Sequence, residues 1–231
     1  MKKIGLIGGM SWESTVEYYR IINEETNKRL GGLHSAKIIM YSFDFDEIEK
    51  FQSQGRWDSA TDVMIEVAKR IEKAGAEIIL ICTNTMHKMF AQIEESVTIP
   101  VLHILDVTAE AIKSKEIKKV GLLGTKFTME QEFYKERLKS AHGIEVIIPD
   151  AQDMEKVNKI IYEELCRGKI KESSKELLKQ IIEGLVDEGA EGIVLGCTEL
   201  PLLIKKEDSS VPIFDTCSLH AKKAVEISLE T

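Results

Sequence analysis

The chain of 231 residues contains an internal repeat. Three segments of the first half return in the second half, in the same order and at nearly the same spacing: Lys2–Gly9 as Lys118–Thr125, Gly75–Asn84 as Gly189–Thr198, and Ile99–Leu102 as Val211–Phe214. With 43% hydrophobic residues, each half has enough apolar side chains for a core of its own. The repeat predicts two pseudo-symmetric domains with a site in the cleft between them.

Apolar runs typical of buried parallel strands alternate with helical patterns throughout the chain, which predicts an α/β fold with mainly parallel sheets. We expect strands at 3–8, 36–43, 77–82, from Pro100, and at 118–123, 144–148, 191–196 and 212–214. We expect helices at 14–29, 57–74, 85–95, 107–115, 128–141, 153–166, 172–187 and 217–229, the first capped by Ser11 and ended by Gly31. The expected domains are 1–98 with 210–231, and 99–209.

Composition argues against several classes of partner. The net charge is −8, from 31 basic and 39 acidic residues, and no basic patch stands out, so we expect no nucleic-acid or membrane binding. The apolar run near Met1 is too short for a signal peptide, and no run reaches membrane-spanning length. The four cysteines form no CxxC pair and no zinc-like cluster. We therefore expect a cytoplasmic protein with reduced thiols and no metal.

Polar residues follow the strand expected at 77–82. The turn Cys82–His87 enters a helix, and its backbone N–H groups and hydroxyls can hold a carboxylate. Thr and Asn are also common N-caps, so an ordinary capped helix start explains the same residues. His87, one helical turn after Thr83, can stabilise a thiolate or bind substrate, and a packed or surface histidine is an equal alternative.

The turn Gly196–Glu199 occupies the equivalent place in the second half. A cysteine at a helix N-terminus has its thiolate favoured by the helix dipole, so Cys197 is a candidate base, with a buried structural cysteine as the alternative. Cys82 is one residue out of phase with Cys197 and matches Gly196, and strand side chains alternate, so we expect Cys82 in the core. Cys166 and Cys217 are also expected to be structural.

Two further segments give weaker indications of function. Gln52, Gln54 and Trp57 fall in an expected loop that can cover the site, or that is an ordinary surface loop. Gly5, Gly8 and Gly9 lack the GxGxxG spacing of a dinucleotide fingerprint, so a nucleotide cofactor is disfavoured.

Three ordered motifs, Gly8–Thr15, Thr83–His87 and Gly196–Glu199, resemble the aspartate/glutamate racemase superfamily over essentially the whole chain. The resemblance implies two similar α/β domains, often a homodimer, and racemisation of acidic amino acids without a cofactor, normally by two opposed thiols. Here Thr83 stands where the first thiol is expected. The sequence is similar to a subgroup with this Thr/Cys pair that is described as specific for L-aspartate and L-glutamate.

The resemblance implies Cys197 as base and Thr83 as the opposing proton donor. It adds a set of substrate contacts: Met10, Gln52, Asn84, Thr85, Thr125, Thr198 and Glu199. A lysine that some aspartate racemases carry is replaced at Cys166, which removes a contact to the substrate's side-chain carboxylate. Two alternatives stay open: a single-cysteine decarboxylase or isomerase of small diacids, and a non-catalytic small-anion binding protein.

Overall fold

The computed structural model describes residues 1–230 and divides into two units. Unit 1 comprises Met1–His103 together with the segment from His220 onward, and unit 2 comprises Ile104–Leu219. Both junctions lie later in the chain than the boundaries expected from the sequence, at 98/99 and 209/210. None of the helices in the described part of the chain is long and apolar enough to cross a membrane.

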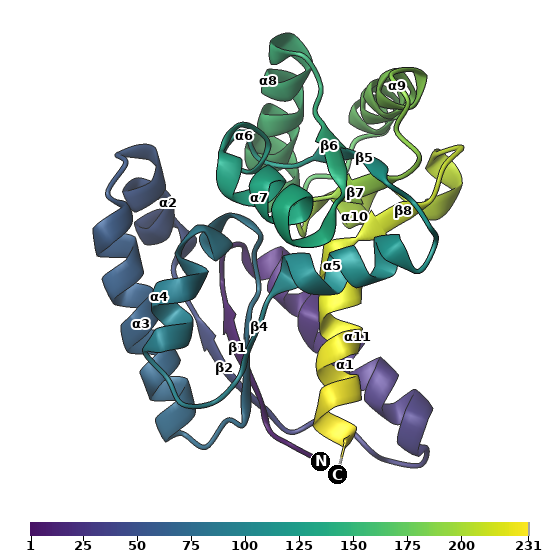
Figure 1. Cartoon of the computed structure of the whole chain (residues 1–231). Helices are drawn as coiled ribbons and strands as arrows, with labels where there is room; N and C mark the ends of the chain where they lie inside the picture. The colour runs from purple at the N-terminus through teal and green to yellow at the C-terminus, as the bar shows by residue number, and fades with distance from the viewer. Residues whose placement is uncertain (231) are drawn as a thin grey trace. The chain divides into compact units, whose positions relative to one another are not determined.

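Unit 1 is built on a four-stranded parallel sheet with the order β2-β1-β3-β4. Its strands are β1 (Ile4–Gly8), β2 (Ile38–Ser42), β3 (Ile78–Ile81) and β4 (Val101–Leu102). Its helices are α1 (Trp12–Leu30), α2 (Phe45–Ser53), α3 (Trp57–Lys73), the 3-10 helix η1 (Thr85–Met89), α4 (Phe90–Glu95) and the later part of α11 (Thr216–Leu229) (Figure 1).

Unit 2 repeats this topology, with the sheet order β6-β5-β7-β8 and all pairs parallel. Its strands are β5 (Lys119–Leu123), β6 (Glu145–Ile147), β7 (Ile193–Leu195) and β8 (Ile213–Asp215). Its helical segments are α5 (Ile104–Lys113), α6 (Lys126–Glu130), α7 (Glu132–Glu136), η2 (Arg137–Ala141), α8 (Ala151–Lys159), η3 (Ile160–Glu164), η4 (Leu165–Arg167), α9 (Glu172–Asp187), α10 (Leu200–Leu203) and η5 (Lys206–Asp208). The expected α/β fold with two similar parallel sheets is confirmed.

In each unit a backbone hydrogen bond joins the end of the third strand to the end of the first, so equivalent turns lie at the same place in the two units. In unit 1 the Cys82 N–H donates to the Ile7 carbonyl at 2.9 Å, just beyond β3, and in unit 2 the Gly196 N–H donates to the Leu123 carbonyl at 2.6 Å, just beyond β7. Cys82 and Gly196 are therefore equivalent, as the repeat predicts. The next residues, Thr83 and Cys197, leave equivalent strands at the carboxyl edge of each sheet, where ligands of such sheets bind.

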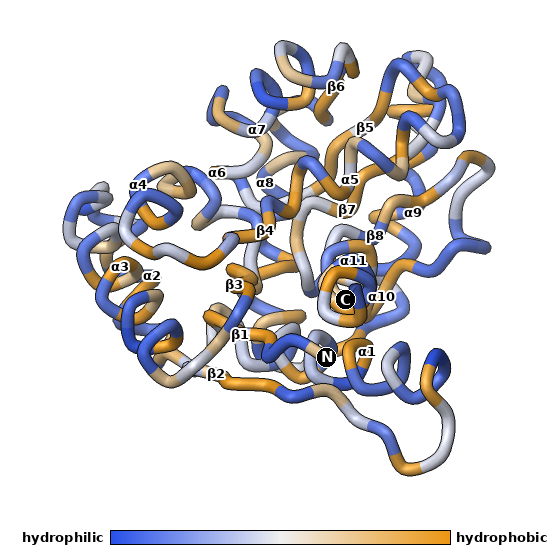
Figure 2. Tube along the Cα trace, turned by 60° about the horizontal axis from the view of Figure 1, so that its bottom comes forward, coloured by the Kyte–Doolittle hydropathy of each residue, from blue (hydrophilic) through white to orange (hydrophobic). Residues whose placement is uncertain are grey.

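The central strands are buried on both faces, as parallel strands covered by helices must be. Figure 2 shows β1 and β2 drawn mostly in the hydrophobic colour, whereas the helices alternate between the two colours. Close approach of the helices depends on glycine at the repeated position. A Cβ on Gly5 would lie 2.4 Å from Ile71 Cγ2, and one on Gly121 would lie 3.0 Å from Leu185 Cδ1.

The sequence interpretation missed α2. The region around Gln52 was expected to be a loop, but Phe45–Ser53 is helical, and Trp57 opens α3. The Asp44 carboxylate caps α2 by accepting from the Asp46 N–H at 3.1 Å, and Ile48 is fully buried. The connection that remains is only residues 54–56. Gln52 thus lies on a helix, which fixes its side chain more firmly than a loop would.

Ser11 precedes α1 as expected but makes no side-chain capping bond. Thr15 organises this turn instead: its hydroxyl donates to the Ser11 carbonyl at 2.7 Å and accepts from the Gly9 N–H at 2.8 Å. Gly31 ends the helix with φ of 73°, as expected.

The helices expected at 128–141 and 153–166 are interrupted in unit 2. Gln131 is extended (φ −77°, ψ 140°), which separates α6 from α7. The second expected helix continues from α8 into a π-helical turn and a 3-10 turn, and Gly168 ends it in the left-handed conformation. Hydrophobic periodicity alone does not reveal such local changes of helix type.

The turn between β1 and α1 depends on Gly9. Gly9 has φ of 85°, and a Cβ there would lie 2.3 Å from the Phe43 backbone N, whereas Gly168 is left-handed with φ of 64° and has nothing within 4 Å. We expect Gly168→Ala to lower the free energy of unfolding by about 1 kcal/mol, from backbone strain alone. Gly9→Ala should cost about 3 kcal/mol, because the Phe43 backbone must also move. Urea unfolding of the two variants measures the difference, and equal losses would contradict the account of this turn.

Candidate active site

The strand ends of unit 1 gather the residues that the sequence singled out. The Phe43 N–H donates to the Gly8 carbonyl at 3.0 Å, so the chain leaving β2 lies against the chain leaving β1. The predicted donor and the four predicted contacts of this half are each at most 8% exposed: Thr83, and Met10, Gln52, Asn84 and Thr85. Polar side chains are thus buried together with Met10 at the carboxyl edge of the sheet.

Gln52 joins the α2 segment to the Thr83 turn. Its Nε2 donates to Met86 Sδ at 3.1 Å, and Gln52 is only 4% exposed. Its Oε1 is buried and has no hydrogen-bond partner within residues 1–230. A buried carboxamide oxygen normally finds a donor, so this atom is suited to accept an N–H or O–H from a ligand.

The Thr83 turn continues as a 3-10 helix, and a side chain completes its hydrogen bonds. The His87 N–H donates to the Asn84 carbonyl at 3.1 Å, and the His87 Nδ1 lies 2.7 Å from the Thr83 carbonyl oxygen. His87 is 4% exposed, so it is a packed histidine rather than a surface one. The sequence placed His87 near the site but gave no sign of this contact.

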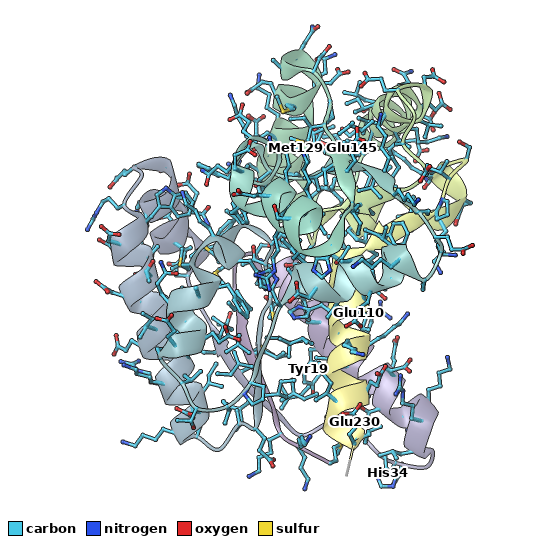
Figure 3. The ribbon with its side chains drawn as sticks, in the orientation of Figure 1. Tyr19, His34, Glu110, Met129, Glu145 and Glu230 are labelled. Carbon is cyan, nitrogen blue, oxygen red and sulfur yellow. The ribbon has the colours of Figure 1, made fainter. Side chains whose placement is uncertain are left out.

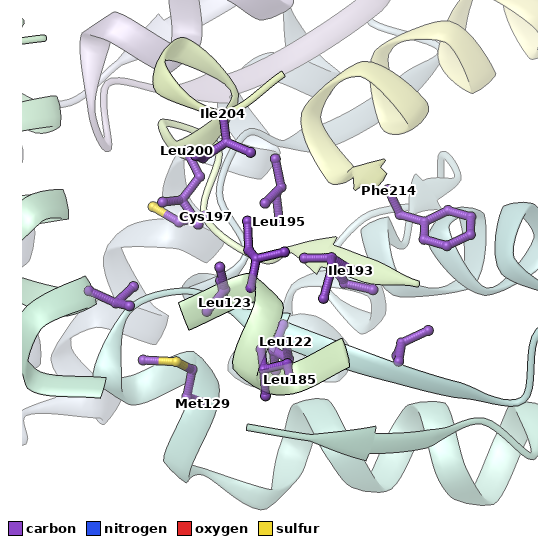
Figure 4. Packing of buried hydrophobic residues seen from close by; sticks show 14 of the residues in the cluster. Leu122, Leu123, Met129, Leu185, Ile193, Leu195, Cys197, Leu200, Ile204 and Phe214 are labelled. Carbon is purple, nitrogen blue, oxygen red and sulfur yellow. The ribbon is translucent and has the colours of Figure 1, made fainter. Parts of the chain in front are cut away.

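Cys197 lies in the turn that leaves β7 in unit 2. It is 6% exposed and belongs to the apolar cluster of this unit. Figure 4 shows Cys197 beside Leu200 and Leu195, with its sulfur pointing outward from the group. The Sγ–H donates to Glu199 Oε2 at 2.8 Å, and the Thr198 hydroxyl donates to the same oxygen at 3.1 Å.

The electrostatics of Cys197 differ from the expectation. Burial, followed by the negative charge of Glu199, raises the pKa of the Cys197 thiol well above its ordinary value. The dipole argument fails because the helix that follows, α10, has only four residues, whereas Glu199 places a buried carboxylate against the sulfur. At neutral pH Cys197 is therefore a thiol that donates to Glu199.

Thr125 lies close to the Cys197 turn within unit 2. Its hydroxyl accepts from the Thr128 N–H at 3.3 Å and caps α6. A Cβ added to Gly124 would lie 3.0 Å from the Gly196 carbonyl oxygen, so the turns after β5 and β7 are in close contact. The structure thus brings Thr125, Cys197, Thr198 and Glu199 to one edge of the sheet.

The other cysteines have the surroundings expected of structural residues. Cys82 is fully buried, its Sγ lies 3.9 Å from the Leu80 carbonyl oxygen, and burial raises its thiol pKa. Cys217 is buried in α11, and Cys166 is half-buried against the apolar cluster of unit 2. The prediction that Cys82 is a core residue is confirmed.

The buried charges are of one sign. Glu13 and Glu199 are the carboxylates that lie buried, at 9% and 2% exposure, and no Lys or Arg is buried within residues 1–230. The buried side-chain donors of the predicted site residues are hydroxyls, carboxamides and the Cys197 thiol.

Comparison with known proteins agrees with this architecture. A family model described as Asp/Glu/Hydantoin racemase matches residues 7–224. A structure from Yersinia pestis that carries a provisional Asp/Glu racemase assignment is 53% identical, covers 100% of both chains and has a TM-score of 0.92. The structure of an aspartate racemase homologue from Pyrococcus horikoshii OT3 is 40% identical, with 100% coverage of both chains and a TM-score of 0.86.

A curated relative extends the comparison to a protein with a named activity. The broad specificity amino-acid racemase RacX of Bacillus subtilis (strain 168) is 26% identical over 98% of each chain. The match of the family model covers almost the whole chain, including the turns that hold Thr83 and Cys197. The chain belongs to the Asp/Glu/Hydantoin racemase family and is an amino-acid racemase.

Proposed function

We propose that the protein racemises acidic amino acids, aspartate and glutamate, without a cofactor, with Cys197 and Thr83 acting on opposite faces of the α-carbon. The observation that carries the proposal is the thiol–carboxylate pair of Cys197 and Glu199 at the end of β7, with Thr83 at the equivalent position after β3. The family membership supports the reaction class, and the similarity to the Yersinia Asp/Glu racemase structure and the Pyrococcus aspartate racemase homologue supports the acidic substrate.

Cys197 starts the reaction on the L enantiomer in this proposal. The thiol first loses its proton to solvent, a step that the negative charge of Glu199, the acceptor of its hydrogen bond at 2.8 Å, makes less favourable. The resulting thiolate removes the α-proton of the substrate, and the electron pair of the broken C–H bond is delocalised into the α-carboxylate. Backbone N–H groups that follow Thr83 and Cys197 hold this carboxylate as its negative charge grows.

Thr83 completes the inversion by giving its hydroxyl proton to the opposite face of the α-carbon and regaining a proton from water. A thiol ionises within a few units of neutral pH, whereas an aliphatic hydroxyl does not without a strong base. Thr83 is therefore a donor and a poor base, and the L enantiomer is deprotonated faster than the D enantiomer.

The equilibrium constant of a racemisation is one, so kcat/KM for inversion must be equal in the two directions. The difference between Cys197 and Thr83 appears instead in the rates of α-proton exchange with retention of configuration. Such exchange needs only one of these two residues for each enantiomer. Exchange into recovered L substrate depends on Cys197, and exchange into recovered D substrate depends on Thr83.

The residues at the strand ends are assigned as contacts to the substrate. Met10, Gln52, Asn84 and Thr85 contact the substrate from unit 1, and Thr125, Thr198 and Glu199 contact it from unit 2 in this proposal. Gln52 Oε1, which lacks a donor among residues 1–230, accepts from the substrate. Because no Lys or Arg among residues 1–230 is buried, the side-chain carboxylate is bound by neutral donors in this proposal, and such donors discriminate acidic from amide side chains only weakly.

We further propose that the protein acts as a homodimer in the cytoplasm. α1 supports this assembly because it exposes Trp12, Val16 and Tyr19, which follow the spacing of one helix face and are more than half exposed. Figure 3 labels Tyr19 on this helix. A second copy of the chain is the partner that such an apolar face would cover.

Substitutions at the two turns test the assignment of roles. Cys197→Ala should lower racemisation of aspartate and glutamate by at least about 1000-fold, because the base is lost. Thr83→Cys should increase deuterium exchange into D-aspartate in heavy water, because a thiol can act as a base on that face. Ligand binding with no exchange in the parent protein would favour a binding protein, and carbon dioxide release from a malonate would favour a decarboxylase.

The raised thiol pKa predicts a pH dependence. A group whose pKa is raised in the folded protein loses its proton only at higher pH, so the exchange rate into L-aspartate should still rise between about pH 7 and pH 9. Glu199→Gln removes the charge that opposes the thiolate, so the rising limb should move to lower pH even if the maximal rate falls. A pH-independent rate over this range, or a limb unmoved in Glu199→Gln, would contradict the assignment.

A further inference from the structure

We propose that His87 is a positioning residue that holds the backbone of Thr83, and with it the Thr83 hydroxyl, in place for proton donation. The inference rests on the proposed role of Thr83 and adds a residue that acts through it. The contact that carries it is the hydrogen bond between the His87 Nδ1 and the backbone carbonyl oxygen of Thr83, at 2.7 Å, and both residues are at most 8% exposed.

The imidazole replaces a backbone donor that this turn lacks. In an α-helix the carbonyl of Thr83 would accept from the N–H of the residue four positions later, which is His87. Here η1 is a 3-10 helix, and the His87 N–H donates to Asn84 instead. The side chain of the same residue then supplies the bond, so a buried carbonyl stays satisfied while the turn remains tight.

The ring of His87 is held on several sides. A carbonyl oxygen only accepts, so Nδ1 must carry a proton, and this fixes the tautomer when the ring is neutral. The ring stacks on Phe90 with a centroid distance of 5.9 Å and an interplanar angle of 8°. The rings of His103 and His220 lie 4.7 and 5.9 Å away between centroids. This packing leaves the imidazole little freedom to turn from the Thr83 carbonyl.

His220 connects this cluster to other elements of unit 1. Its Nε2 donates to the Leu102 carbonyl at 3.0 Å, and its Nδ1 accepts from the Tyr18 hydroxyl at 2.9 Å. Burial, and next the nearby charge of His87, lowers the pKa of His220 to about 3, so it stays neutral. The Thr83 turn is therefore connected to α1, β4 and α11 through the ring contact of His87 with His220 and the two hydrogen bonds of His220.

Loss of the hydrogen bond between His87 and the Thr83 carbonyl should affect proton donation by Thr83 more than proton removal by Cys197. Cys197 lies in unit 2, on a different sheet, and makes its hydrogen bond with Glu199. Displacement of Thr83 should therefore reduce proton donation and leave proton removal from the L enantiomer in place. A shift of about 1 Å in a reacting group can reduce a rate by about 100-fold.

The test follows L-aspartate in heavy water and measures the partition between inversion to the D enantiomer and deuterium exchange into recovered L substrate. His87→Phe keeps a ring beside Phe90 but removes the donor, and we expect the inversion-to-exchange ratio to fall by about tenfold or more. His87→Asn places an N–H at the position of Nδ1 and should restore the ratio to within about threefold. His34→Phe, in the exposed loop after α1, is the control and should leave it unchanged (Figure 3).

A double variant separates positioning from general damage. In a Thr83→Ala background, His87→Phe should lower the ratio no further, because the group it positions is gone. Three results would each overturn the inference while leaving the proposed function in place. In His87→Phe, inversion and exchange with retention of configuration could fall by the same factor. The losses could be additive in the double variant, or His87→Asn could fail to restore the ratio. Should His87→Phe not fold, His87→Asn decides: a parental ratio supports the inference, and equal losses overturn it. Absence of any exchange in the parent protein would overturn the proposed function itself.

Discussion

The backbone hydrogen bond that crosses from the third strand of each sheet to the first is the constraint on which both half-sites depend. The Cys82 N–H meets the Ile7 carbonyl in unit 1, and the Gly196 N–H meets the Leu123 carbonyl in unit 2. These bonds fix where each chain leaves its sheet, so the following residue is always presented at the carboxyl edge. In the proposed mechanism, the residue type at that place, Thr83 in one unit and Cys197 in the other, decides the chemistry.

The duplicated backbone thus carries an asymmetric pair of side chains. A buried carboxylate, Glu199, accompanies the thiol and keeps it protonated at rest. A buried imidazole, His87, accompanies the hydroxyl and bonds to its backbone rather than to its oxygen. In the proposed mechanism, one unit provides a group whose proton can be withdrawn, and the other provides a group whose position is fixed. This division of roles follows from the neighbours of each turn more than from the fold.

Much of the fold was predictable because the repeat and the hydrophobic runs are strong local signals. The expected strands were found, often a few residues shorter, and the displacement of Cys82 relative to Cys197 followed from the repeat alone. The helix α2 was missed because only Ile48 and Gln52 of its 9 residues are buried, so the helical spacing of apolar residues is weak there. Changes of helix type, such as the extended Gln131, leave no periodic signal.

The contacts around the candidate site were harder to predict for a physical reason. The thiol pKa depends on burial and on the direction of the Glu199 carboxylate, neither of which spacing specifies. The contact of Tyr18 with His220 joins residues 202 positions apart. His87 was placed near the site by sequence, but its bond to the Thr83 carbonyl depends on the turn being a 3-10 helix rather than an α-helix.

One measurement tests the central claim, that a doubled fold carries a single effective base, most directly. The initial rates of deuterium exchange from heavy water into recovered L-aspartate and recovered D-aspartate are compared for the parent protein. The account predicts faster exchange into the L enantiomer, because only Cys197 can form an anion that removes the α-proton readily. Equal rates for the two enantiomers would contradict it, since they would require Thr83 to act as a base as effective as the thiol.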